Sequence, residues 1–166
     1  MRNLIAFPIL ALAVILQSAV VSRISLLGGF ADLPLVLVIA WALQENVNTG
    51  WHWAIVAGLM TAFVSGLAWI VIMLGFVAAV LVARVLQSRI WQAPLLAMLG
   101  VTFFATLIVH LLSFVILSLT RVPLPFADTF SLITLPSVLL NMLLAIPMFW
   151  FMRDLSRWVF PIEEDE

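Results

Sequence analysis

The arginines of this chain lie between its long apolar stretches rather than within them. Arg2 lies at one chain end, Arg153 and Arg157 lie near the other, and Arg84 and Arg89 mark one central break. Hydrophobic residues make up 66% of the 166 positions, and charged residues make up only 9%. A soluble domain of this size could not remove so much apolar surface from water. The sequence therefore predicts an all-α integral membrane protein.

Composition excludes several other classes of protein. The net charge of −1 lacks the basic excess of a nucleic-acid binder, and the absence of cysteine rules out disulfides and thiol chemistry. The segment 4–21, which follows Arg2, is similar to a signal peptide. Its small-residue cleavage pattern is poor, so we expect it to remain as the first span.

We expect a compact bundle of about six transmembrane helices, because one span needs about 20 mostly apolar residues. The apolar stretch 51–83 is too long for a single span, and the best break is Ser65-Gly66-Leu67. The second span is short unless residues 24–27 join it. The expected spans are 4–21, 32–43, 51–64, 68–83, 93–119 and 130–151. The expected connections include a loop or re-entrant turn at 22–31, polar loops at 45–50 and 87–92, and an extended loop at 120–129.

Orientation follows from the side of the membrane on which arginines gather. Six spans place both termini on the side that holds five of the seven arginines, which predicts cytoplasmic termini. Most tryptophans fall near the same edge, as an aromatic belt would: Trp41, Trp51, Trp53, Trp91, Trp150 and Trp158. Residues 1–152 then form the transmembrane bundle, and residues 153–166 form a cytoplasmic interfacial tail.

Small residues recur every four positions along the third expected span. They are Ala54, Gly58, Ala62 and Gly66. Helices in lipid associate through close packing, which favours small residues where two helices meet. This face either docks a partner helix or packs against the protein's own helices, as most such faces do.

Polar residues inside the fifth and sixth spans form a second set of candidates. Each span carries them on one helical face: Thr102, Thr106, His110 and Ser113 in the fifth, and Ser137 and Asn141 in the sixth. We expect buried polar sites, because an unpaired polar group in lipid is costly. They could bind a ligand or a partner, or they could bond to one another inside the bundle.

No pattern in the sequence is typical of an enzyme. The histidines are His52 and His110 alone, so no metal-ligand cluster can be assembled from histidine and cysteine. No Ser/His/Asp arrangement, phosphate-binding glycine loop or pair of carboxylates within the spans is present. We therefore expect no catalytic residue, no metal and no cofactor.

Several short motifs follow one another in a characteristic order. Leu16-Gln17-Ser18 ends the first span, Asp32-Leu33-Pro34 opens the second, and Gly-Leu-Met-Thr-Ala-Phe-Val-Ser-Gly occupies residues 58–66. Asn141, Pro147 and Arg153 mark the last span. This order, over nearly the whole chain, resembles the MreD family of bacterial rod-shape-determining membrane proteins. Ala62 departs from the family at a position that is commonly acidic, and Leu67-Ala68-Trp69 replaces the family's Pro-Leu-Gly.

The resemblance implies a non-catalytic scaffold of the bacterial elongation complex, or elongasome, that helps couple MreB filaments to peptidoglycan synthesis and cell shape. The implied partners are MreC and, in the same complex, MreB, RodA and a penicillin-binding transpeptidase, besides membrane lipid. The family is similar in fold to the substrate-binding subunits of energy-coupling-factor vitamin transporters, which implies a cavity open toward the outside. The alternative is a small-ligand-binding subunit of such a transporter, with a pocket lined by Thr102, Thr106, His110 and Asn141.

Overall fold

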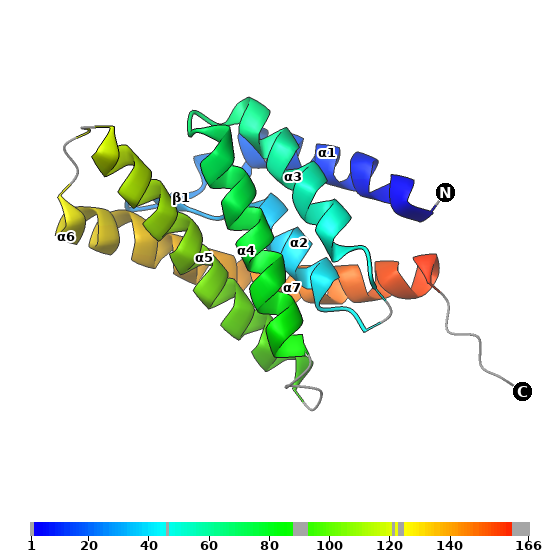
Figure 1. Cartoon of the computed structure of the whole chain (residues 1–166). Helices are drawn as coiled ribbons and strands as arrows, with labels where there is room; N and C mark the ends of the chain where they lie inside the picture. The colour runs from blue at the N-terminus through cyan, green and yellow to red at the C-terminus, as the bar shows by residue number, and fades with distance from the viewer. Residues whose placement is uncertain (1, 46, 88–92, 121, 123–124, 161–166) are drawn as a thin grey trace, which may run out of the picture.

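The computed structural model of the chain describes residues 2–45, 47–87, 93–120, 122 and 125–160, most of which are helical (Figure 1). Four helical segments are long and apolar enough to cross a membrane: Ala6–Arg23, Trp69–Gln87, Pro94–Leu119 and Phe126–Val159. Two further apolar helices, Leu33–Ala42 and Gly50–Val64, are shorter. The chain is therefore an all-α multi-pass membrane protein.

The first helix, α1, spans Ala6–Ala19 and is flanked by single 3-10 turns, η1 (Arg2–Ile5) and η2 (Val21–Arg23). A small antiparallel hairpin follows, formed by β1 (Ser25–Leu26) and β2 (Gly29–Phe30). The predicted loop at 22–31 thus contains a hairpin, and residues 24–27 do not extend the second helix.

Helix α2 (Leu33–Ala42) occupies the centre of the bundle. All ten of its residues are buried, and it contacts α1, α3, α4, α5 and α7. A helix that is apolar on every side can be stable only when it is covered on every side. Ten residues extend about 15 Å, roughly half the thickness of the hydrocarbon core, so α2 alone is too short to span it.

The predicted break between the third and fourth spans is confirmed. Helix α3 (Gly50–Val64) ends at Ser65, whose side-chain oxygen accepts the N–H of Leu67 at 3.2 Å. Helix α4 (Trp69–Gln87) then packs back against α3 (Figure 1). The polar connection predicted after Gln87 falls on residues 88–92, which lie outside the described residues.

Helix α5 (Pro94–Leu119) packs on α4 and α7. The loop expected over residues 120–129 is shorter than predicted, because a helical turn, α6 (Phe126–Thr129), already begins at Phe126. It leads through one π-helical turn, η3 (Phe130–Thr134), into α7 (Leu135–Val159). The last helix thus continues through Arg153 without a break, while the acidic end of the predicted tail lies in residues 161–166, outside the described part.

A proline in α7 explains how the hairpin is attached to this helix. In a regular helix the carbonyl of Leu132 would accept the N–H of residue 136, but Pro136 has none. The N–H of Gly28 donates to this carbonyl at 2.9 Å instead, and the N–H of Phe30 donates to Ser137 Oγ at 3.2 Å. The hairpin therefore completes the hydrogen bonding that the proline leaves open.

The start of α1 and the end of α7 lie at one end of the bundle, here called the termini end (Figure 1). There Trp41 and Trp53 are each 1% exposed and stack with ring centroids 4.4 Å apart. The ring centroid of Phe160, the residue just after α7, lies 6.2 Å from that of Trp41. The predicted aromatic belt is therefore wrong for Trp41 and Trp53, which pack inside the protein because the indole rings can cover one another. Trp51, Trp150 and Trp158 are exposed, and Trp91 lies outside the described residues.

Candidate functional site

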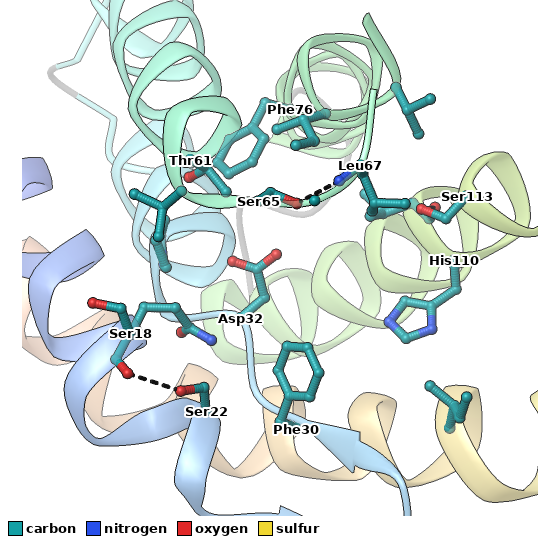
Figure 2. A pocket seen from close by; sticks show the side chains of 18 of the residues that line it. Ser18, Ser22, Phe30, Asp32, Thr61, Ser65, Leu67, Phe76, His110 and Ser113 are labelled. Atoms are coloured by element: carbon teal, nitrogen blue, oxygen red, sulfur yellow. Dashed lines mark hydrogen bonds between the residues drawn. The ribbon is translucent and has the colours of Figure 1, made fainter. Parts of the chain in front are cut away.

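A cavity of about 600 Å³ opens among α1, the hairpin, the first half of α4, and the ends of α3 and α5 (Figure 2). The hairpin and the turn between α3 and α4 lie on the side of the bundle away from the termini end (Figure 1). This volume lies within the range of sites that bind small molecules. Much of the wall is apolar, and the aromatic side chains in it are Phe30, Phe76 and Phe114.

Polar side chains from several elements face the same cavity. They are Gln17, Ser18, Ser22, Asp32, Thr61, Ser65, His110, Ser113 and Thr129. Among the described lining residues Asp32 is the one carboxylate and no arginine is present, while lysine does not occur in the chain. The wall therefore combines apolar surface with hydroxyls and a single acidic group.

Side chains from α1 and α7 hold the backbone that carries Asp32. The amide of Gln17 bonds on both sides of this residue: Nε2 donates to the carbonyl of Ala31 and Oε1 accepts the N–H of Leu33, each at 2.8 Å. The N–H of Asp32 itself donates to Asn141 Oδ1 at 2.6 Å. Three consecutive residues are thus fixed where the chain enters α2, in a segment where no helix or sheet could satisfy their backbone.

Asn141 extends this network into the bundle. Its Nδ2 donates to Thr106 Oγ1 at 3.0 Å, and Thr106 Oγ1 donates to the carbonyl of Thr102 at 2.7 Å. Asn141 and Thr106 are each 1% exposed. The amide therefore bridges α7, α5 and the start of α2, and it gives the side chains of Asn141 and Thr106 hydrogen-bond partners away from water. Thr102 Oγ1 is buried without a partner among the described residues.

The structure separates the predicted polar residues into two groups. Thr102, Thr106, Ser137 and Asn141 are buried within the bundle, whereas His110 and Ser113 are half-buried and line the cavity. His110 Nδ1 lies 3.3 Å from Thr134 Oγ1, and Ser113 Oγ donates to the carbonyl of Val109 at 2.8 Å. Of the four residues expected to line a ligand pocket, His110 alone does so, because the other three face the packed interior.

The small-residue face of α3 is likewise divided. Ala54 and Gly58 are buried, and a Cβ on Gly58 would lie 2.7 Å from Met73 Sδ of α4. Ala62 is half-buried, and no atom lies within 4 Å of a Cβ built on Gly66. Gly58 thus serves the contact between α3 and α4, Ala54 is buried within the bundle, and only Ala62 and Gly66 remain accessible.

Replacing Gly58 by leucine is expected to lower the free energy of unfolding by about 1–3 kcal/mol, because the new side chain must displace Met73 and Phe76. Thermal unfolding of the purified protein in detergent measures this loss. Gly66→Leu, in the turn just after α3, is the matched control and should leave the unfolding midpoint nearly unchanged, because no atom lies within 4 Å of a Cβ at this position. Equal losses in the two variants would show that Gly58 has no special role in packing.

Sequence reasoning missed most of the cavity wall. Gln17, Asp32, Thr61 and Ser65 appeared in the motifs, but none was predicted as a site residue. Each lies near the end of an apolar segment, where a polar residue is ordinarily read as the start of a loop. One feature of the sequence could have identified these residues together. The turns between the predicted spans are short, so the span ends that carry them must lie close together.

Comparison with protein-family models, with curated proteins and with solved structures found no match. Among the described residues no group of three or more His, Cys, Asp or Glu side chains could hold a metal ion. The functional interpretation therefore depends on the cavity, the network around Asp32 and the order of the motifs.

Proposed function

We propose that this chain is a non-catalytic membrane scaffold of the bacterial elongation complex, of the MreD kind, and that it binds MreC. The observation that supports the proposal is the convergence of the motifs that carry the resemblance. Gln17, Asp32 and Asn141 belong to one hydrogen-bond network, and Thr61 and Ser65 line the cavity beside it. The motifs that carry the resemblance therefore come together in one region of the fold, at the cavity.

The proposed mechanism is docking between helices within the membrane. Ala54 is buried and Gly58 is covered by α4, so the single span of MreC would reach the open end of this face, at Ala62 and Gly66. The neighbouring Phe63 is 82% exposed and offers apolar contact there. Small residues beside a large one allow close backbone approach and van der Waals packing, which drive helix association in lipid.

The proposed orientation places the termini end in the cytoplasm of a bacterium, at its inner membrane. Arg84, Arg153 and Arg157 lie at this end, where Arg84 Nη2 donates to the carbonyl of Val47 at 2.9 Å. An excess of arginine in short connections favours the cytoplasmic side. MreB filaments would then meet the inner ends of α4 and α7, while RodA and the transpeptidase would join through MreC.

Depletion of the protein in the organism that encodes it tests this proposal. Rod-shaped cells are expected to become round as the protein disappears, and a plasmid-borne wild-type copy should restore the rods. Rods of normal width after complete depletion, with MreC still present, would contradict a role in the elongation complex.

A second candidate function is supported by the cavity itself. A small-ligand-binding subunit of a vitamin transporter would need such a space, with polar groups to orient its substrate. Thermal unfolding in the presence of individual water-soluble vitamins separates the two functions. A strong, saturable rise of the unfolding midpoint with one vitamin would favour the transporter subunit, since bound ligand stabilises the folded state.

A further inference from the structure

We propose that the cavity is a binding site for a small organic cation, whose ammonium group pairs with the carboxylate of Asp32. This inference depends on the cavity and goes beyond the scaffold function. A failure to bind MreC would leave it unaffected, and its own failure would leave the scaffold proposal intact.

The position of Asp32 is the first argument. Its Oδ1 accepts the N–H of Leu35 at 3.0 Å and thereby caps α2. Figure 2 shows the carboxylate pointing across the cavity toward the turn that carries Ser65. Because the backbone on both sides is fixed by Gln17 and Asn141, the carboxylate is held in place before any ligand arrives.

The lack of a counter-charge is the second argument. No ion pair involving Asp32 is found among the described residues, and no arginine lines the described cavity wall. A carboxylate removed from water is strongly destabilised unless a cation or hydrogen-bond donors compensate it. A ligand cation would supply what the protein does not, whereas an anionic ligand would be repelled.

The remaining wall indicates the rest of the ligand. Thr61 Oγ1 is buried without a hydrogen-bond partner among the described residues, and Ser65 lies beside it in the wall. Hydroxyl oxygens can accept the ammonium N–H groups that Asp32 leaves free. Phe30, Phe76 and Phe114 supply apolar and aromatic surface for the body of the ligand. The chemistry is therefore an amine on an apolar or aromatic body.

A matched set of small probes tests the charge requirement on the full chain purified in detergent. The probes are 2-phenylethylamine, which is a cation at neutral pH, 2-phenylethanol, which is neutral, and phenylacetate, which is an anion. Isothermal titration calorimetry at low-millimolar concentration is expected to show saturable binding of the amine alone. Saturable binding of the alcohol equal to that of the amine, or no binding of the amine, would overturn the proposal.

Asp32→Asn tests the assigned residue. Asparagine caps helices as well as aspartate does, so α2 should keep its cap while the charge is lost. The affinity for 2-phenylethylamine is expected to fall about tenfold or more. Asp128→Asn is the control, because Asp128 is exposed in α6 and does not line the cavity. Unchanged affinity in folded Asp32→Asn would overturn the assignment, and the comparison of probes on the wild type stands even if this variant does not fold.

An ammonium group could come from a soluble amine or from the headgroup of phosphatidylethanolamine. The titration is therefore repeated in nanodiscs of phosphatidylglycerol with and without phosphatidylethanolamine. Competition by phosphatidylethanolamine would identify the lipid as the natural source of the cation. Undiminished binding of the probe would identify a soluble amine.

Discussion

Asn141→Leu is expected to lower the free energy of unfolding by about 2–4 kcal/mol, because it removes two hydrogen bonds of the network and leaves the N–H of Asp32 without an acceptor. The N–H of Asp32 would lose its acceptor, and Thr106 Oγ1 would lose the donor that reaches it from α7. Leucine has a similar volume, so the loss would come from hydrogen bonds rather than from a cavity. Unfolding in detergent, followed by circular dichroism, measures it.

The control for this experiment is Asn48→Leu, which changes the same residue type at an exposed position between α2 and α3. Its effect on the unfolding midpoint should be small. A second comparison is Thr106→Val, which removes the hydroxyl that accepts the hydrogen bond from Asn141. It should lower the free energy of unfolding by less than Asn141→Leu does, because the N–H of Asp32 keeps its acceptor. If Asn141→Leu were as stable as the wild type, the network could not be what joins α2, α5 and α7.

Gly29→Ala is expected to lower the free energy of unfolding by about 2 kcal/mol or more and to detach the hairpin from α7. A Cβ on Gly29 would lie 2.5 Å from the carbonyl oxygen of Ile133 and 2.7 Å from the backbone nitrogen of Ser137. These are backbone atoms of a helix, which cannot rotate away as a side chain can. Hydrogen exchange of the hairpin amides, with the unfolding midpoint, measures the effect.

Gly66→Ala is the matched control for this prediction, because no atom lies within 4 Å of the added Cβ. It should leave both the hydrogen-exchange protection of the hairpin amides and the unfolding midpoint unchanged. Wild-type protection of the Gly28 amide in Gly29→Ala would mean that the hairpin does not need this close approach.

The parts of the fold that local sequence determines were predictable. The break at Ser65-Gly66-Leu67, the ends of α3 and the extent of α5 follow from hydropathy and turn residues, and the structure confirms them. The bounds of the short second helix, predicted at 32–43 and found at Leu33–Ala42, were also predictable. Its burial on every side was not, because a short apolar run has the same pattern in a membrane span as in a helix surrounded by other helices. The prediction that Trp41 and Trp53 belong to an aromatic belt was wrong for a related reason. A tryptophan near a helix end is found both in aromatic belts and in packed cores.

The candidate site was less accessible to sequence reasoning than the fold. Asn141 and Thr106 could be predicted to be buried, because each lies within a long apolar helix. Their bond to each other, and the bond from Asp32 to Asn141, depend on how α2, α5 and α7 are placed in space. The cavity draws single residues from separate elements, so no periodic pattern along one helix marks it. Asp32 in particular looked like an ordinary residue at the end of a span.

Purification of the tagged full chain from native membranes, with co-purifying proteins identified by mass spectrometry, tests the central claim most directly. The scaffold account predicts that MreC is recovered with the wild type. It also predicts much weaker recovery from Ala62→Trp, which obstructs the open end of the α3 face. Ala127→Trp, the same substitution at an exposed alanine of α6 outside this face, serves as the control and should leave the recovery of MreC unchanged. Recovery of transporter ATPase subunits without MreC would contradict the account.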